Sequence, residues 1–395
     1  MDNFKNFDTT AIHAGEEENK PKNALNEPIF MTSTFTFDNL EHAKKTFSFE
    51  TDDYVYTRGN NPTLKTFEKK MAALEEGAGG VAFASGMAAI TSTLLSAAES
   101  GEEILSHRVI YGSTHNVMKK VLPENGIKTK FIDLTDISQI KASLSKNTAA
   151  IYIETPANPN LDIIDIKQIN QITEEFNLKI IVDNTFATPY FQKPLKNGAD
   201  IVVHSATKYI SGHGDVVAGI VVANDKDYLH RLKFDYMTEY GGVLSPFNAW
   251  LLLRGLKTLG LRMRTHEGNA LKVAGFLEDH SAVKKVYYPG LDNFSGYEIA
   301  NSQMSGYGAV LSFELNGDLK RAEKFVDSLK MIKLAVSLGD AETLIEYPFA
   351  MTHRGYSETE LKQLGLNKKM IRLSVGLEGY EDIISDIKQA LNVEG

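Results

Sequence analysis

The stretch "ADIVVHSATKYISGHGD", residues 199–215, places a single lysine shortly after a run of apolar residues. Its first part, "ADIVVHS" (199–205), is short, apolar and rich in β-branched residues, which predicts a buried strand. A lysine beyond the end of such a strand loses hydration, and that loss is unfavourable unless the charge is paired or removed. Lys208 therefore either reaches water or serves as a neutral, reactive amine.

Other runs along the chain have the same character and predict further strands. They are "EILSH" (103–107), "AAIYIET" (149–155) and "KIIVDNTF" (179–186). Helical patterns lie between and before them: "TLKTFEKKMAALEEG" (63–77) predicts an amphipathic helix closed by Gly77, and "GVAFASGMAAITSTLLSAA" (80–98) predicts a strand, a turn and an apolar helix. Strands that alternate with helices predict an α/β fold with a mainly parallel sheet covered on both faces.

The chain divides into three expected regions. At 395 residues it is long for one hydrophobic core. Residues 1–60 are loop-rich with little core of their own, so we expect an arm that lies against something else. Residues 61–254 predict the large domain, and residues 255–395 predict a smaller C-terminal α/β domain.

Composition excludes several classes of function. The net charge of −9 argues against nucleic acid or an anionic membrane as partner, because both require a basic face. The absence of cysteine excludes disulfides, thiolate catalysis and cysteine-ligated metals, and no third ligand accompanies His204 and His213, so no metal site is predicted. With no apolar signal core near residue 1 and no membrane span, we expect a soluble cytoplasmic protein.

Polar residues follow four of the predicted strands, at the edge where an open α/β sheet binds its ligands. These positions are residues 85–87, 154–158, 183–184 and 204–208. They bring an acid, a lysine, hydroxyl groups and a small-residue turn that opens a helix to one rim of the sheet.

Pyridoxal phosphate (PLP) needs all of these groups together. Its aldehyde forms a covalent link to an amine such as Lys208, and its ring nitrogen stays protonated beside a carboxylate such as Asp183. Its phosphate binds backbone N–H groups at a helix start, for which Gly86 allows a close approach, and hydroxyl donors such as Ser205 and Thr207. Desolvation would lower the pKa of Lys208 and make its amine nucleophilic near neutral pH.

A family resemblance accompanies these features over nearly the whole chain, with the motifs in the same order as in the family. The sequence resembles the Cys/Met-metabolism, or trans-sulfuration, group of fold-type I PLP-dependent enzymes. The motifs that carry the resemblance are "YTRGNNPT" (56–63), "IYIETPANPN" (151–160), "VDNTFATPYFQKPL" (182–195), "SATKYISGHGDVVAGIVV" (205–222) and "IRLSVGLE" (371–378).

The resemblance implies roles for residues around the cofactor. Lys208 would hold PLP and move protons between substrate carbons, Asp183 would pair with the ring nitrogen, and Tyr111 would stack on the ring and act as a general acid or base. Asn158 would contact the side of the ring that carries the hydroxyl. The phosphate would be bound by Ser85, Gly86, Met87, Ser205 and Thr207.

The resemblance also implies a substrate clamp and a shared site. Arg372 would grip the substrate carboxylate through two hydrogen bonds, with help from Ser337. Tyr56 and Arg58 would reach the phosphate of a neighbouring subunit. We therefore expect a homodimer with shared active sites at least, and a tetramer as the usual form in the family.

Each residue taken alone also has an ordinary structural explanation. Asp183 would cap a turn, Tyr111 would be a half-buried core tyrosine, and Arg372 would pair with a nearby acid. Their joint occurrence in the order of the family favours the functional interpretation.

The reaction within the family depends on a few positions. Val336 stands where cystathionine γ-lyases typically carry a glutamate, and an apolar residue suits the short thioether of methionine better than the distal ammonium of cystathionine. Residues 337–344 and 241–259 also resemble the methionine γ-lyase branch. Ser113 departs from that branch, which usually carries cysteine there, and "YMTEYGG" (236–242) lacks its usual Lys-Asp pair.

We therefore expect α,γ-elimination of L-methionine, and of homocysteine, to a thiol, 2-oxobutyrate and ammonia. The alternatives within the family are a cystathionine γ- or β-lyase, a homocysteine desulfhydrase, and an O-acetylhomoserine sulfhydrylase that replaces a group at Cγ. A non-catalytic scaffold that kept the fold is the alternative of another class, and the presence of Lys208, Asp183 and Tyr111 argues against it.

Overall fold

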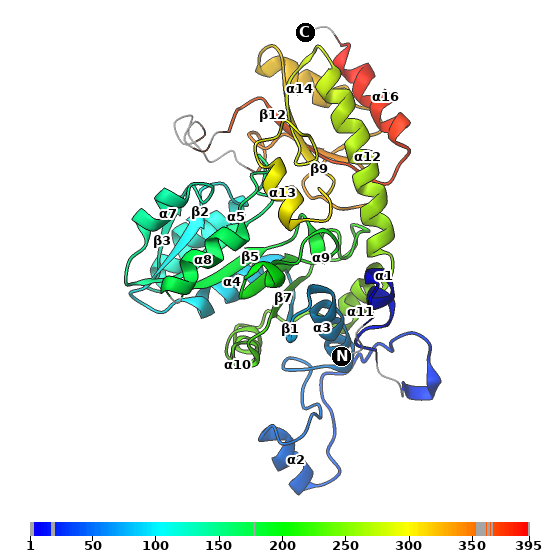
Figure 1. Ribbon diagram of the computed structural model, residues 1–395. Coiled ribbons are helices and arrows are strands. Elements are labelled where there is room, and N and C mark those ends of the chain that lie inside the picture. The colour runs from blue at the N-terminus through cyan, green and yellow to red at the C-terminus, as the bar shows by residue number, and fades with distance from the viewer. Residues whose placement is uncertain are drawn as a thin grey trace.

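Two β-sheets organise the chain, as the computed structural model shows (Figure 1). The structure describes residues 4–16, 20–176, 178–352, 361, 364 and 366–393. The other positions of the predicted N-terminal arm and C-terminal domain lie outside the described residues. One sheet has seven strands in the order β1-β7-β6-β5-β4-β2-β3, and the other has five in the order β10-β11-β12-β9-β8.

The large sheet is mainly parallel, as predicted. Its strands are β1 (Gly79–Phe83), β2 (Glu103–His107), β3 (Lys128–Ile132), β4 (Thr148–Glu154), β5 (Lys179–Asp183), β6 (Ile201–Ser205) and β7 (Gly219–Ala223). Strands β3, β2, β4, β5 and β6 pair in parallel, and β7 runs antiparallel to both of its neighbours. The carboxyl ends of β4, β5 and β6 therefore meet at one edge.

Helices cover both faces of this sheet. On one face, α4 (Gly86–Ala97) packs against side chains such as Tyr152, Ile181 and Val203. On the other face, α3 (Pro62–Glu75) and α8 (Ile166–Phe176) pack against the alternate residues of the same strands. The remaining helices around the sheet are α5 (Gly112–Asn116), α6 (Leu122–Glu124), α7 (Ile137–Ser143), α9 (Thr188–Phe191), α10 (Lys226–Arg231) and α11 (Pro246–Leu256), with π-helical turns at Val117–Val121 and Leu232–Thr238 and a 3-10 turn at Pro194–Asn197.

The end of α3 corrects one detail of the sequence prediction. Glu76, not Gly77, adopts the left-handed conformation that closes the helix, with φ of 60°. Gly77 follows it, and its N–H donates to Ala72 O at 2.8 Å. A glycine is needed there because a Cβ atom would lie 2.5 Å from Val222 Cγ1.

The small sheet forms a second α/β unit. Its strands are β8 (Val283–Tyr287), β9 (Val310–Leu315), β10 (Lys333–Leu334), β11 (Leu344–Glu346) and β12 (Met370–Ser374). The helices α12 (Leu259–Asp279), α13 (Tyr297–Gln303), α14 (Leu319–Asp327) and α16 (Tyr380–Leu391) accompany it. Apolar side chains of α12, α14 and α16 pack on the sheet, and α12 runs from the large unit into the small one (Figure 1).

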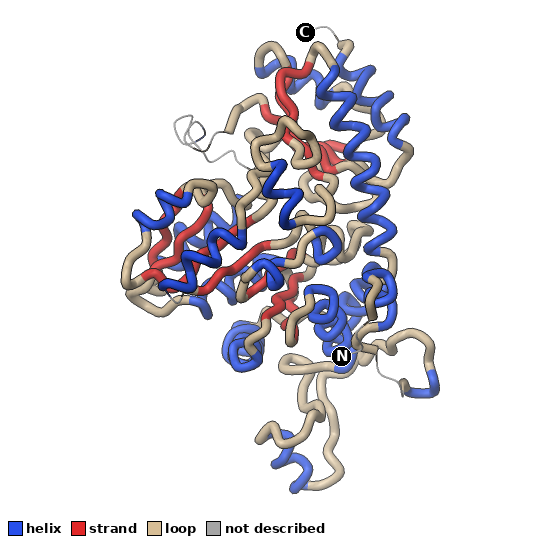
Figure 2. The backbone as a smooth tube through the Cα atoms, in the orientation of Figure 1, coloured by secondary structure: helices blue, strands red, loops and turns tan. Residues whose placement is uncertain are grey.

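The part of the N-terminal segment that carries α2 (Leu40–Phe47) projects away from both sheets, whereas the beginning of the segment lies against α3 (Figure 1 and Figure 2). Its first helix, α1 (Phe7–His13), is fastened to α3 by the buried Lys70, whose Nζ donates to Ala11 O at 3.1 Å and to Ile12 O at 2.6 Å. Beyond the 3-10 turn Pro21–Asn23, the chain is mostly loop around α2 (Leu40–Phe47). Large apolar side chains are exposed along it, namely Leu25, Met31, Leu40, Phe47 and Phe49.

Candidate active site

A cavity of about 240 Å³ lies at the carboxyl ends of β4, β5 and β6. The large unit provides most of its wall, and the small unit closes it through β11, β12 and the loop before β11. Twelve of the predicted cofactor and substrate residues line it: Ser85, Gly86, Met87, Tyr111, Asn158, Asp183, Ser205, Thr207, Lys208, Val336, Ser337 and Arg372.

Lys208 follows β6 in a short turn and points into this cavity. Its Nζ donates to Ser337 Oγ at 2.8 Å. Burial lowers the pKa of Lys208 to about 8, and the neighbouring Arg372 guanidinium acts in the same direction, whereas the carboxyl groups of Asp340 and Glu346 oppose the shift. Neutral amine is therefore available at mildly alkaline pH.

The start of α4 forms one end of the cavity. Ser85 caps the helix through its hydroxyl oxygen, which accepts from Ala88 N at 3.0 Å. The N–H groups of Gly86 and Met87 belong to the first turn, where a helix offers no backbone acceptor, so they suit an anion. A Cβ at Gly86 would lie 2.7 Å from Ser205 Cβ, so only glycine lets the helix start approach β6 this closely.

The two hydroxyl groups near this helix start differ in their contacts. Thr207 Oγ1 donates to Ala218 O at 3.2 Å and accepts from Ala218 N at 3.0 Å. Ser205 lies against Gly86. Ser205 is therefore placed to donate directly to a phosphate, whereas Thr207 would first have to release the carbonyl of Ala218.

Asp183 ends β5 with a buried carboxyl group. Its Oδ1 accepts from Thr185 N at 3.0 Å and Thr185 Oγ1 at 2.5 Å, and its Oδ2 accepts from Tyr152 OH at 3.3 Å. Burial raises the pKa of Asp183, while these donors and the nearby His204 oppose the shift. A cation beside Asp183, such as a protonated ring nitrogen, would favour the ionised carboxylate.

Arg372 reaches the cavity from β12 and is almost completely buried. It donates to Asn158 Oδ1 at 3.0 Å and to Ser337 O at 2.8 Å, and it forms an ion pair with Glu346, directly opposite on β11. Its Nε has no hydrogen-bond partner among the described residues. Arg372 thus both pairs with an acid and keeps a buried donor for a ligand.

Ser337 connects the lysine and the arginine. Its hydroxyl accepts from Lys208 and its carbonyl accepts from Arg372. The residue has a φ of 97°, an unfavourable conformation for a side chain with a Cβ. A strained backbone conformation persists where the surrounding contacts enforce it. At Ser337 these are the contacts with Lys208 and Arg372, two candidate site residues.

Three predicted residues lie outside the cavity wall. Ser113 lies in α5 and does not line the cavity. Tyr56, which is 45% exposed, and Arg58 line a separate groove beside Met31 and Pro246. Arg58 also donates to Thr238 O at 3.4 Å, and neither Tyr56 nor Arg58 lines the cavity of its own chain.

Two acids of the site were missed at the sequence level. Glu154 was noted only as part of a polar strand end, and Glu346 was not noticed at all. What marks these two acids is their partner on a neighbouring strand, which lies far away in the sequence. Glu346 lies opposite Arg372 in the β11–β12 register, and Glu154 lies opposite Asp183 in the β4–β5 register. Pairing across strands is needed to see either one.

The described residues contain neither a cluster of metal ligands nor a helix that could span a membrane. No group of three or more His, Asp or Glu side chains in that part of the chain is arranged to hold a metal ion. None of the described helices has the length and apolar character needed to cross a membrane.

Comparison with known proteins identifies the class of this site. The family model "Cys/Met metabolism PLP-dependent enzyme" matches residues 8–392. The fold is that of the fold-type I PLP-dependent enzymes: the structure of metY from Campylobacter jejuni, solved with N'-pyridoxyl-lysine-5'-monophosphate, superposes with a TM-score of 0.94 at 34% identity, over 98% of this chain and 99% of that chain. The chain belongs to the Cys/Met-metabolism family of PLP-dependent enzymes.

Curated relatives differ in the reaction that they catalyse. An L-methionine gamma-lyase of Fusobacterium nucleatum subsp. nucleatum is 47% identical over 386 residues, which is 97% of each chain. A cystathionine beta-lyase of Lactococcus lactis subsp. cremoris is 45% identical over 383 residues, 97% of this chain and 98% of the relative. The protein is a methionine γ-lyase-like PLP-dependent lyase, and overall identity does not separate the two substrates.

Proposed function

We propose that the protein catalyses the α,γ-elimination of L-methionine, which with one water gives methanethiol, 2-oxobutyrate and ammonia, and the same reaction of homocysteine, which releases hydrogen sulfide in place of methanethiol. Val336 is the observation that supports this choice most directly. It lies on the rim of the cavity, is 55% exposed, and is accompanied there by Val217. The nearby Glu346 is engaged by Arg372, so the rim offers apolar contact to a methylthio group.

The residues of the cavity fit PLP. Lys208 would hold it covalently, Asp183 would lie at the ring nitrogen, and Asn158 beside the ring hydroxyl. The start of α4 at Gly86 and Met87, with Ser85 and Ser205, would bind the phosphate. When bound, PLP supplies an electron sink for the bonds at the substrate Cα and Cβ.

The side chains of the site divide the remaining work among themselves. The Lys208 amine, released from the cofactor, would carry a proton between Cα and Cβ, and Ser337 Oγ holds this amine near the clamp. Tyr111, 38% exposed at the start of α5, would give a proton to the departing sulfur. Arg372 would bind the substrate carboxylate through its free Nε, replacing part of its contact with Glu346.

A second copy of the chain would complete the site. Tyr56 and Arg58 lie in a groove apart from their own cavity, and the projecting N-terminal segment carries exposed apolar side chains. We infer a homodimer in which Arg58 of one subunit reaches the phosphate of the other, assembled further into a tetramer. The cytoplasmic location stays a prediction.

Subunit mixing tests the shared site. Lys208→Ala and Arg58→Ala subunits, each inactive alone, should regain activity when they form mixed dimers, because one of the two sites then has both residues intact. Mixed dimers that form but stay inactive would contradict sharing.

Product analysis tests the reaction. With L-methionine as sole substrate, we expect methanethiol and 2-oxobutyrate in equal amounts. The cystathionine β-lyase alternative, favoured by the 45% identical relative, predicts faster turnover of cystathionine, with pyruvate and homocysteine as its products. Parallel assays with homocysteine, and with O-acetylhomoserine plus sulfide, test the desulfhydrase and sulfhydrylase alternatives.

A rim variant sharpens this assay. Val336→Glu places a carboxylate where a distal ammonium would lie, so the ratio of kcat/KM for cystathionine to that for methionine should rise by about tenfold or more. Val217→Glu, on the same rim, is the matched control. An unchanged ratio in Val336→Glu would remove Val336 as a determinant of specificity.

A further inference from the structure

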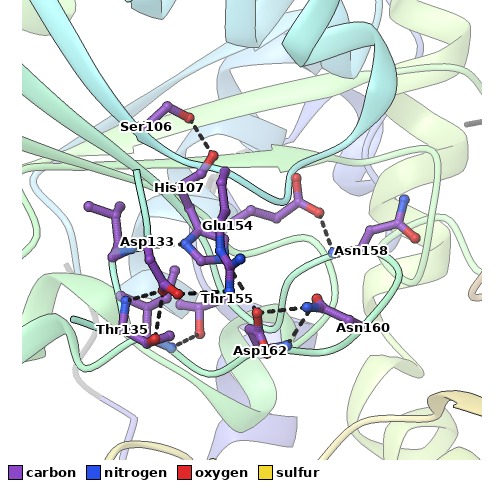
Figure 3. A network of polar contacts seen from close by, with 12 residues as sticks. Ser106, His107, Asp133, Thr135, Glu154, Thr155, Asn158, Asn160 and Asp162 are labelled. Carbon is purple, nitrogen blue, oxygen red and sulfur yellow. Dashed lines mark hydrogen bonds and ion pairs between the residues drawn. The ribbon is translucent and has the colours of Figure 1, made fainter. Parts of the chain in front are cut away.

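Glu154 ends β4, and its buried carboxyl group lies between two candidate cofactor contacts. Its Oε2 accepts from Tyr111 N at 2.9 Å, and its Oε1 accepts from Asn158 N at 2.9 Å. Figure 3 shows its carboxyl group turned toward the backbone of Asn158. Only 4% of Glu154 is exposed, so water does not substitute for these contacts.

The two N–H groups that Glu154 binds belong to loops rather than to the sheet. Tyr111 precedes the first turn of α5, and Asn158 lies in the loop after β4. Neither N–H has a backbone acceptor in the part of the chain that the structure describes. The carboxyl group of Glu154 is therefore the contact that holds both loop backbones at the edge of the sheet.

The position of Glu154 in the sheet adds a second consequence. It pairs with Asp183 in the β4–β5 register, so both side chains extend from the same face. Burial raises the pKa of Glu154 to about 8, and Asp183 contributes to the rise, whereas the N–H groups of Tyr111 and Asn158 and the charge of Arg372 oppose it. Two buried carboxyl groups this close resist ionising together, so a cation at the position expected for the ring nitrogen would favour their ionised forms.

Asn158 extends the reach of this carboxyl group to the substrate clamp. The backbone of Asn158 is held by Glu154, while its side-chain Oδ1 accepts from Arg372 at 3.0 Å. A shift of Asn158 would therefore move the guanidinium as well. One side chain is linked in this way to the ring-stacking tyrosine on one side and to the arginine clamp on the other.

We propose that Glu154 is a positioning residue that fixes Tyr111 over the cofactor ring and Asn158 beside it. Its kinetic consequences rest on the proposed function, whereas its effect on the bound cofactor requires only the PLP site. Glu154 couples two steps that would otherwise be independent, protonation of the leaving sulfur and binding of the substrate carboxylate.

Glu154→Gln is the main test. Glutamine keeps the size of the side chain but has one acceptor oxygen, so its amide NH₂ faces one of the two N–H groups. In the holoenzyme we expect a loss of the circular dichroism of the bound cofactor, because the ring is less firmly held. For methionine we expect kcat to fall about 30-fold and KM to rise. Glu154→Asp, which keeps the carboxyl group but shortens the side chain, should show the same optical loss.

A double-mutant cycle shows whether Glu154 acts through Tyr111. If Tyr111→Phe alone lowers kcat about 100-fold, the double variant should lie near 100- to 300-fold, not near the product of roughly 3,000-fold. Multiplicative losses would overturn the link to Tyr111.

Asp386→Asn is the matched control. Asp386 is also a buried carboxylate that accepts from backbone N–H groups, those of Lys330, Met331 and Ile332, but it lies in the small unit away from the cavity. Its substitution should lower thermal stability and leave the optical signal, kcat and KM unchanged. An optical signal that survives Glu154→Gln, or that is lost equally in Asp386→Asn, would overturn the proposal.

The circular dichroism of the bound cofactor also distinguishes a failure of this proposal from a failure of the proposed methionine reaction. If the wild-type holoenzyme does not release methanethiol, the methionine reaction fails, but the cofactor signal of Glu154→Gln still decides the role of Glu154. If methionine is turned over and Glu154→Gln matches the wild type in signal and rate, only the role of Glu154 fails.

Discussion

The two faces of the large sheet use polar residues at the same strand ends in opposite ways. On the face of α4, Asp183 and Glu154 lie in the cavity wall. On the face of α3, Asn184, the residue directly after Asp183, and His204 of β6 are buried, and Glu75 Oε1 accepts from Asn184 at 3.0 Å and contacts His204 Nε2 at 2.6 Å. Because successive side chains alternate in a strand, a shift of one residue separates a ligand-facing group from a structural one.

The largest expected effect on the α4 face is that of Lys208→Ala. Without the amine, PLP has no covalent attachment and no carrier for the proton, so kcat should fall by about 10⁴-fold or more. Borohydride should fix the cofactor in the wild type, but not in this variant. Fixation at another lysine in Lys208→Ala would show that the site has been assigned to the wrong residue.

The next effect is that of Asp183→Asn. The amide cannot stabilise a protonated ring nitrogen, so kcat should fall by about 10²- to 10³-fold while PLP stays covalently bound. The measurement is steady-state kinetics together with the absorbance of the bound cofactor. A variant with near wild-type kcat would mean that the α4 face does not supply the ring partner.

The rate at which PLP attaches to Lys208 should depend on pH, and this dependence measures the pKa that burial gives to the Lys208 amine. Only the neutral amine attacks the aldehyde, and burial lowers the pKa of Lys208 to about 8. The rate of attachment to the apoenzyme should therefore rise about tenfold per pH unit below 8 and level off above it. Stopped-flow absorbance measures the rate, and a rise that continues toward pH 10 would indicate an exposed lysine.

The sequence was sufficient to predict the strand ends at which the cavity lies, but not which face of the sheet each residue occupies. The run "KIIVD" that forms β5 shows why: Ile180, Ile181 and Val182 are all completely buried, because helices cover both sides. Alternation is invisible in such a strand. Asp183 could be assigned through the family resemblance, whereas Glu154 had no motif role and needed the register with β5 and the contacts to two loops.

Glu346 was hidden for a different reason. It lies in a strand of three residues, β11, and its partner Arg372 is far along the chain on β12. Neither helix period nor strand alternation predicts such a pair. Arg372 combines the two interpretations that the sequence leaves open, because it pairs with Glu346 and also keeps an Nε that has no hydrogen-bond partner among the described residues.

Glu75→Gln should have the smallest effect on catalysis and tests the α3 face. The substitution weakens buried contacts with His204 and Asn184, so we expect the free energy of unfolding to fall by about 1–3 kcal/mol, measured as a lower thermal midpoint. Because these contacts lie on the face opposite the cavity, kcat and the cofactor spectrum should stay within about twofold of the wild type. A large fall in kcat at unchanged thermal stability would show that the network of Glu75, His204 and Asn184 reaches through the sheet to Asp183. The two faces would then form one functional unit. Strand alternation would still decide which face a side chain occupies, but residues of both faces would contribute to catalysis.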